Sequence, residues 1–156
     1  MLSAIVLTKK TQEVCRRRVD IIRSDTDYAL RALAHLALHK DDGPIAAKAL
    51  ASAEDIPEDF VYKLLRSLTK AGLVESYMGA QGGFALARDP SKVTLLEAVE
   101  AIQGPVTVRK CLLGKGDACP RHQSCPLSVK LEGLQCAVDQ FMTKLTLSEM
   151  VESLKS

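Results

Sequence analysis

The chain has 156 residues, of which 47% are apolar and 26% are charged, enough for one compact domain with a buried core. No apolar run approaches the roughly 20 residues of a membrane-spanning helix, and the first charges follow only a short apolar stretch, the reverse of a secretory signal. We therefore expect a cytoplasmic protein without a membrane partner. Its five cysteines are irregularly spaced, and in a reducing compartment such cysteines are more often ligands or sensors than disulfide partners.

Charge is distributed unevenly along the chain. Residues 1–18 carry a net charge of +4, so the remainder, with 16 basic and 18 acidic residues, is net −2. We expect residues 1–19 to be a basic extension: a disordered tail, a basic arm, or sequence upstream of a start at Val19. Because the total charge of +2 is small, a claim of nucleic-acid binding must rest on where charge is placed locally.

Helical periodicity begins after residue 20 and occurs three times. The segment SDTDYALRALAHLALH places its apolar residues on one face, with Ser24 or Thr26 as the expected cap. The break DDGP separates it from a short second helix in IAAKALASAEDI. Pro57 opens a third helix, PEDFVYKLLRSLTK, whose leucines and basic residues lie on opposite faces and which ends before Gly72.

The pattern then changes to that of a hairpin. VESYM and FALAR predict two short strands joined by the Gly-rich turn GAQGG. The predicted fold is mainly α with a small two-stranded β wing, a winged helix-turn-helix that occupies residues 20–104 together with the following helix. In this fold the third helix enters the major groove of DNA, and the wing lies along the backbone or the adjacent minor groove.

The third helix and the wing also carry a local excess of positive charge. Between Tyr62 and Arg88, four basic residues stand against Glu75, a local charge of +3 that suits DNA phosphates. Acidic Asp59 is unfavourable beside phosphates but can accept from a cytosine amino group at a base edge. A basic helix face can also be merely solvated, and a winged helix can serve as a protein-binding module. The expected DNA contacts are Asp59, Tyr62, Lys63, Arg66, Gln81, Gly82 and Gly83.

The next helix begins at a capping box formed by Thr94 and Glu97 and runs through LLEAVEAIQ to Gly104. A loop over residues 105–126 follows, and helical periodicity returns at about Pro126. There the apolar residues alternate steps of four and three: Leu127, Leu131, Leu134, Val138, Phe141 and Leu145.

Such a 3.5-residue period is typical of a helix that faces another helix. It predicts a homodimer formed through residues 127–156, whereas packing of this row onto its own winged domain would allow a monomer. A second capping box, Thr146 with Glu149, predicts a final short helix. Cys136 lies off the row, and we interpret it as a small packed residue.

The loop between Gly104 and Pro126 contains Cys111, Cys119 and Cys125 in the run CLLGKGDACPRHQSCPL. Thiolates are soft ligands that select iron–sulfur clusters, zinc or copper(I), and a loop can wrap around a cluster. A structural zinc site would favour paired C-x2-C spacing, which is absent. An iron–sulfur cluster is the expected cofactor, with a metal-free thiol switch as an alternative.

Four motifs in this order resemble the iron–sulfur cluster-binding winged-helix regulators of the IscR, NsrR and RirA type: TDYALRAL, IPEDFVYKLLRSLTKAGLVES, GAQGGFALARDP and the cysteine loop. The resemblance covers about residues 20 to 150. It implies a homodimeric transcription regulator that binds a double-stranded DNA operator and holds a cluster on the three loop cysteines. Operator affinity would then follow cluster occupancy, type or redox state, and we expect a repressor that responds to iron, redox conditions or nitric oxide.

The fourth ligand is where this chain departs from the best-known members. Seven residues separate Cys111 from Cys119, and Ser128 stands where IscR has a histidine ligand. In NsrR the fourth ligand is an aspartate of the first helix of the other subunit, and the matching residue is Asp27; without metal, such a carboxylate simply stabilises a helix start. His122 within the loop is the rival ligand. An aspartate-completed site favours a 4Fe-4S cluster slightly over a 2Fe-2S cluster.

We do not expect an enzyme, because the chain lacks a phosphate loop, a dinucleotide fingerprint and a Ser-His-Asp arrangement. His35 and His39 share a helix face, and we interpret them as ordinary helix residues. The competing function is that of an iron–sulfur carrier or electron-transfer protein whose winged fold binds another protein.

Overall fold

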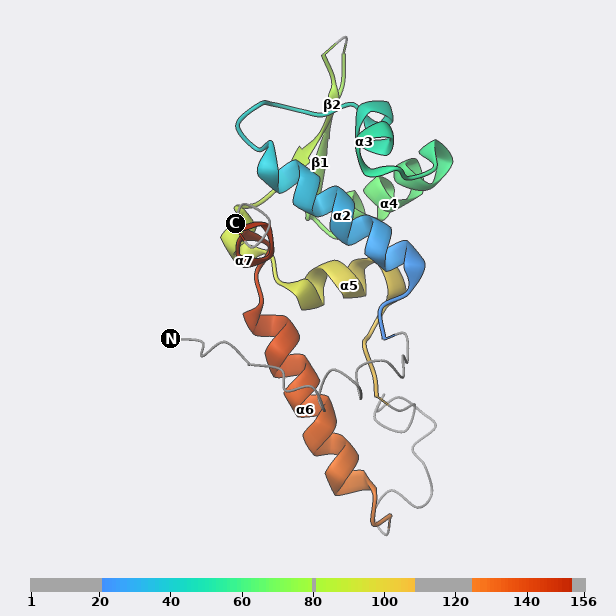
Figure 1. Cartoon of the computed structure of the whole chain (residues 1–156), viewed down its shortest axis with the longest axis vertical. Helices are drawn as coiled ribbons and strands as arrows, with labels where there is room; N and C mark the ends of the chain where they lie inside the picture. The colour runs from blue at the N-terminus through green and yellow to red at the C-terminus, as the bar shows by residue number, and fades with distance from the viewer. Residues whose placement is uncertain (1–20, 80, 109–124, 153–156) are drawn as a thin grey trace, which may run out of the picture.

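A computed structural model describes residues 21–79, 81–108 and 125–152. Its elements follow in the order α2 (Ser24–Leu38), α3 (Ala47–Glu54), α4 (Glu58–Lys70), β1 (Val74–Tyr77), β2 (Gly83–Leu86), the 3-10 helix η1 (Pro90–Lys92), α5 (Leu95–Gln103), α6 (Ser128–Lys144) and α7 (Leu147–Glu152). The predicted winged helix-turn-helix is confirmed. The wing projects from one end of the helical domain, and α6 extends from the other (Figure 1).

The hydrophobic core lies between α2, α3, α4 and α5, and α7 packs against α2. Leu33, Leu50, Leu65 and Leu68 are each 0% exposed. Complete burial of one such side chain is worth about 1.5–3 kcal/mol. The apolar face of α4 is buried in this core, so its other face is left for solvent or a ligand.

The wing is an antiparallel hairpin in which Val74 pairs with Leu86 and Tyr77 with Gly83. The segment before α3 joins it, because the Ile45 N–H donates to the Phe84 carbonyl at 2.9 Å and the Phe84 N–H donates to the Ile45 carbonyl at 2.8 Å. A Cβ at Gly83 would lie 2.5 Å from the Ile45 carbonyl carbon, so a side chain does not fit there. Close contact of two backbones therefore anchors the wing to the helical domain.

The predicted capping of the helices is confirmed at some ends and wrong at one. Thr94 and Glu97 form the capping box of α5, and Gly72 follows α4 with a φ of 71°. The expected cap of α2 is wrong: Arg23 occupies the N-cap position without a side-chain cap, and Thr26 lies in the first turn, fully buried. The Thr26 hydroxyl instead donates to the side chain of Gln103, which is 77 residues away in the chain, so the sequence around Thr26 does not indicate this partner.

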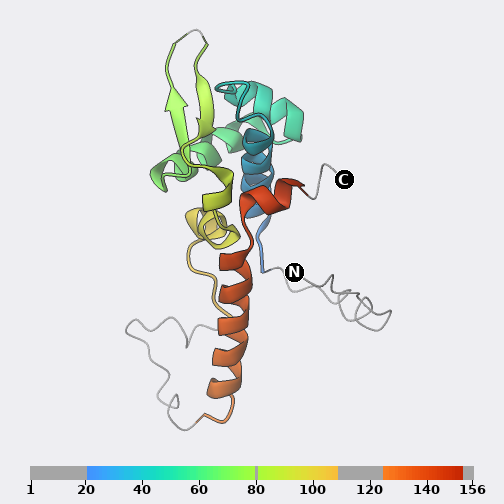
Figure 2. The same ribbon diagram turned by 90° about the vertical axis from the view of Figure 1, so that its left-hand side faces the viewer.

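The helix α6 extends away from the winged domain along a single direction (Figure 2). The predicted apolar row divides into two sides. Val138 and Leu145 pack against a second core cluster formed with α5, whereas Leu127, Leu134 and Phe141 are 55%, 50% and 59% exposed. The exposed three recur every seven residues, so they form one stripe along the helix.

None of the helices in the described part of the chain combines the length and the apolar composition required to cross a bilayer.

Candidate nucleic-acid interface and cysteine site

A groove lies between α4 and the wing. Its lining contains three cations and no acid: Tyr62, Lys63, Arg66, Thr69, Lys70, Ser76 and Phe84. Within the described residues, these three cations form no ion pair. Asp59 is exposed on the first turn of α4 but does not line the groove. The unpaired cations give this surface the charge that a phosphate backbone attracts.

Aromatic contacts orient one of these cations. The Lys63 ammonium lies 5.8 Å from the centre of the Phe60 ring, a cation–π distance. The Phe60 ring in turn meets Tyr28 of α2 edge-on, with 6.1 Å between centroids, and Arg31 lies 5.4 Å from the centre of the Tyr28 ring. Lys63 is thus held by a chain of contacts that joins the exposed face of α4 to α2.

Arg88 does not belong to this groove, although it contributes to the local charge excess in the sequence. Its guanidinium donates to the Glu97 carboxylate at 2.9 Å, and Glu97 also accepts from the Thr94 N–H at 3.0 Å. Partial burial acts to raise the pKa of Glu97, but the hydrogen bonds from Thr94 and Arg88 outweigh it and hold that pKa below its ordinary value. Arg88 therefore links the segment that follows the wing to α5.

The wing tip is exposed and uncharged. Met78 is 99% exposed, and Gln81 is exposed as well. A Cβ at Gly82 would lie 2.4 Å from the Tyr77 carbonyl oxygen, so the turn itself requires this glycine. Gly82 and Gly83 thus both have structural reasons for being glycine.

Only one of the three loop cysteines lies in the described residues. Cys111, Cys119 and His122 lie outside them. The Cys125 side chain is half-buried, and its carbonyl accepts from the Ser128 N–H at 3.1 Å and the Ser128 hydroxyl at 2.9 Å. Ser128 thus fixes Cys125 against the first turn of α6. Across the described segments, no three His, Cys, Asp or Glu side chains are grouped in a way that could hold a metal ion.

Asp27 lies at the start of α2 with its side chain 63% exposed, and Arg31 is 4.0 Å from its carboxylate. Arg31 also pairs with Glu54 at 3.7 Å. Cys125, in contrast, precedes the first turn of α6, and that end of α6 is the one farthest from the winged domain (Figure 1). Within the described part of one chain, neither Asp27 nor Cys125 belongs to a group of three side chains that could hold a metal ion.

The two histidines of α2 have carboxylate partners. Nδ1 of His35 lies 2.8 Å from Glu54, and Nδ1 of His39 lies 2.7 Å from Asp42. Their rings are 4.7 Å apart. These contacts agree with their interpretation as ordinary helix residues. The expectation for Cys136 is wrong, because it is exposed on α6.

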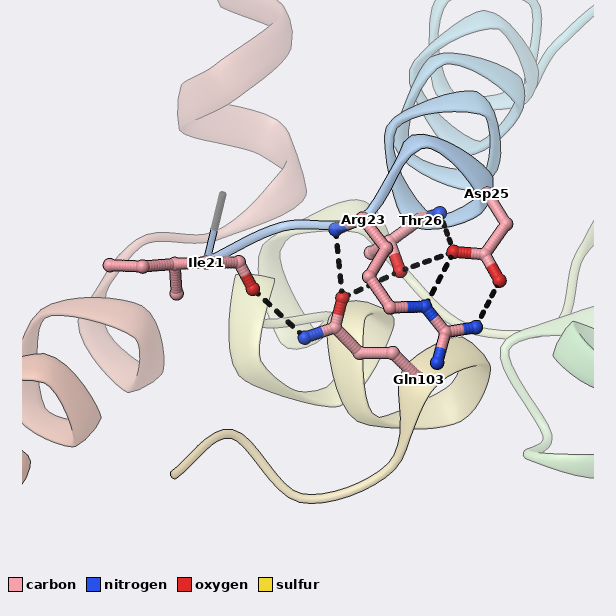
Figure 3. Close-up of polar contacts among 5 residues, drawn as sticks. All are labelled: Ile21, Arg23, Asp25, Thr26 and Gln103. Atoms are coloured by element: carbon pink, nitrogen blue, oxygen red, sulfur yellow. Dashed lines mark hydrogen bonds and ion pairs between the residues drawn. The ribbon is translucent and has the colours of Figure 1, made fainter. Parts of the chain in front are cut away.

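A hydrogen-bonded network between α5 and the start of α2 escaped the sequence analysis (Figure 3). The side-chain oxygen Oε1 of Gln103 accepts from the Arg23 backbone N–H at 3.1 Å and from the Thr26 hydroxyl at 2.8 Å. Its side-chain nitrogen Nε2 donates to the Ile21 carbonyl at 3.0 Å. Leaving the buried Thr26 hydroxyl without this acceptor would cost about 1–3 kcal/mol. Beside it, the hydrogen bond from Arg23 holds the pKa of Asp25 below its ordinary value.

A winged helix-turn-helix whose third helix carries cations without ion-pair partners is the arrangement used by DNA-binding transcription regulators. The chain belongs to the Rrf2 family, described as iron-dependent transcriptional regulators, whose model matches residues 22–153. It is 34% identical over 134 residues to a protein of Aquifex aeolicus (strain VF5) named as an HTH-type transcriptional regulator, covering 84% of this chain and 92% of that one.

Two further comparisons bear on fold and family. The HTH-type transcriptional regulator IscR of Yersinia enterocolitica is 29% identical over 126 residues, covering 81% of this chain and 76% of that protein. CymR, the global cysteine regulator of B. subtilis, superposes with a TM-score of 0.70 at 24% identity, covering 85% of this chain and 96% of that one. At this identity the second comparison shows the shared fold alone.

Proposed function

We propose that this transcription regulator is a homodimer whose affinity for a double-stranded DNA operator depends on an iron–sulfur cluster bound by Cys111, Cys119 and Cys125. The observation that carries the DNA-binding part is the groove between α4 and the wing, with its unpaired Lys63 and Arg66. A regulator of this kind acts on the chromosome, so a cytoplasmic location belongs to the proposal.

On DNA, α4 enters the major groove and the wing follows the backbone or the minor groove. Lys63 and Arg66 bind phosphates or base edges, and Tyr62, which is 52% exposed, contacts a base edge. Asp59 accepts from a cytosine amino group. Contacts from the wing come from Gln81 and from the backbone at Gly82 and Gly83. A symmetric dimer would place the two copies of α4 about one turn of DNA apart.

The exposed stripe of α6 supports the dimer. It continues into a shallow apolar groove lined by Ile21, Ile22, Leu95, Ala137, Val138, Phe141 and Met142. The α6 helix of a second copy carries the same stripe, so a two-fold axis makes the surface complementary to itself. Burial of Leu134 and Phe141 in this way removes their apolar surface from water.

The three loop cysteines and Asp27 of the other subunit would hold the cluster. When bound, the cluster supplies a site whose iron reacts with oxygen or nitric oxide or is lost when iron is scarce. Two features support this ligand set: the family is described as iron-dependent, and the Asp27 carboxylate is exposed. The Ser128 hydroxyl donates to a backbone carbonyl, which disfavours it as a ligand. A 4Fe-4S cluster is slightly preferred, and loss of the cluster would alter repression.

The test is to purify the protein anaerobically, record its visible absorption and iron content, and measure binding to the DNA upstream of its own gene with and without the cluster. A coloured protein whose two forms differ in affinity supports the proposal. Asp27→Ala should lower cluster stability, whereas Asp41→Ala, an exposed carboxylate of the loop after α2, is the control.

Other outcomes identify the competing functions. Colourless, iron-free protein that binds DNA in a thiol-dependent manner would indicate a metal-free thiol switch. Coloured protein that binds no DNA in either form would indicate an iron–sulfur carrier. An unchanged cluster in Asp27→Ala would remove Asp27 from the ligand set and direct attention to His122.

A further inference from the structure

Two glutamine side chains, one at the end of α5 and one in α6, each bond to a short piece of backbone in the same way. Gln103 accepts from the Arg23 N–H and donates to the Ile21 carbonyl. Gln135 of α6 accepts from the Val108 N–H at 2.8 Å and donates to the Val106 carbonyl at 2.9 Å. Each carboxamide thus bridges the carbonyl of one residue and the N–H of the residue two positions later, the pair of groups that a neighbouring parallel strand would bond.

The two glutamines act on opposite ends of the segment that follows α5. Gln103 ends α5, and Gly104 follows with a φ of 79°, a conformation that favours glycine. Val106 is 7% exposed, packed with residues of α5 and α6. The short segment Gly104–Val108 is therefore fixed to α2 through Gln103 at its start and to α6 through Gln135 at its end.

This segment leads directly into the stretch that contains Cys111 and Cys119. The chain returns at Cys125, whose carbonyl is bonded by Ser128 of α6. Within the described residues, the two ends of the cysteine-bearing stretch are thus bonded to α6, and the entering side continues through Gln103 to the first turn of α2. The α2 helix packs against α3 and against α4, and α4 lines the cationic groove.

We propose that Gln103 and Gln135 are positioning residues that carry the state of the cysteine-bearing stretch to the first turn of α2 and from there to α4. The proposal rests on the proposed cluster-dependent DNA binding for its regulatory meaning. Its structural part, that a change at Gln135 reaches the start of α2 through Gly104–Val108, is independent of any metal.

The structural part is tested on the full-length, metal-free protein by amide hydrogen exchange. Gln135→Leu should speed exchange of the Arg23 amide about 10-fold, although the partners of Gln135 within the described residues are Val106, Val108 and Asp139. Gln140→Leu is the matched control, because Gln140 is an exposed glutamine of the same helix. Faster exchange confined to Val108 would overturn the proposal.

The regulatory part is tested by the ratio of operator affinities with and without the cluster. In Gln103→Leu and Gln135→Leu this ratio should fall at least about 5-fold toward one, while iron content per chain stays at the wild-type value; 5-fold is the lower end of typical allosteric coupling. Gln103→Glu should restore part of the ratio, because a carboxylate still accepts from Arg23 and Thr26 but cannot donate to Ile21. A wild-type ratio in both Leu variants would overturn the link.

The two failures are distinguishable. If the wild-type protein binds no cluster or its affinity does not depend on one, the proposed function fails, and the exchange experiment still decides whether the tethers are coupled. If wild-type regulation is intact and the exchange of Arg23 does not respond to Gln135→Leu, the tethers are local supports and the inference fails alone.

Discussion

Large apolar side chains are buried in the winged domain but exposed along one side of α6. In the domain, Leu33 and Leu65 are completely buried, whereas along α6 Leu134 and Phe141 are at least half exposed. The domain completes its own core, so its apolar residues stabilise the fold of one chain. The regular exposed stripe of α6 has no such role within one chain, which is the pattern expected of an interface. Burial within one chain thus separates the residues that stabilise its fold from those left available for the proposed dimer interface.

The largest expected effect is on the domain side of this comparison. Leu65→Ala should lower the free energy of unfolding by about 3 kcal/mol, within the usual range of 2–5 kcal/mol, because it opens a cavity between α2 and α4. Urea denaturation at fixed protein concentration measures the loss. Leu127→Ala, which removes an exposed leucine at the far end of α6, is the matched control and should cost far less. Equal losses would contradict the division.

The second prediction addresses the association side. Phe141→Ala should raise the dimer dissociation constant at least about 10- to 100-fold, because burial of one such side chain contributes about 1.5–3 kcal/mol and the substitution removes one from each subunit. Sedimentation equilibrium measures the constant, and far-UV circular dichroism should show an unchanged fold. Thr143→Ala, at an exposed neighbouring position, is the control. An unchanged dissociation constant would remove the stripe from the interface.

The third prediction concerns the cationic groove, which belongs neither to the buried core nor to the exposed stripe of α6. Arg66→Ala should weaken operator binding and reduce the slope of log affinity against log salt by about 1.8, because the dimer loses one phosphate contact of about 0.9 in each subunit. Fluorescence anisotropy over a range of salt concentrations measures both quantities. Lys92→Ala removes an equal charge from η1, outside the groove, and should leave the slope unchanged. If the two substitutions change the slope equally, the groove is not the site of phosphate contact.

A smaller effect is expected where the domain meets α6. Thr94→Ala removes the cap of α5 and should destabilise the protein by about 1 kcal/mol. Thr94 also forms an isolated bridge with Thr146, between α6 and α7, so this position joins the two regions. Thermal unfolding measures the change, and Thr94→Ser, which retains a capping hydroxyl, should recover most of it.

The smallest effect concerns pH. Because the folded pKa of Glu97 lies below its ordinary value, its stabilising contribution is complete above the unfolded pKa and is lost as pH falls through the folded pKa. Glu97→Gln should therefore lose less stability than the wild type between about pH 5 and pH 3. Urea midpoints across this range measure the difference. A steeper acid loss in the variant would contradict the assignment.

Much of the fold could be predicted because its signals are local. The apolar periodicity of α4, the Gly-rich turn of the wing and the capping box at Thr94 each depend on residues close in sequence. The errors arose where a distant residue intervened. The Thr26 hydroxyl donates to Gln103 instead of capping α2. Arg88, which the sequence counts in the local charge excess, pairs with Glu97 outside the groove.

The candidate site was predictable in part for the same reason. Tyr62, Lys63 and Arg66 share the exposed face of one helix, so helical periodicity identifies them together, and the structure places them in one groove. Asp59 lies on the same helix but outside that groove. The ligand role of Asp27 is a prediction that depends on a second chain, which the periodicity of one sequence does not describe.

The sequence alone determined the order of helices and strands, the cationic face of α4 and the spacing of the cysteines, because these depend on the identity and order of neighbouring residues. Only the tertiary structure decided which half of the α6 row is covered, and that Gln103 and Gln135 tether the segment entering the cysteine-bearing stretch. A glutamine can bond to almost any backbone group, so its partner is selected by the fold that brings the two together.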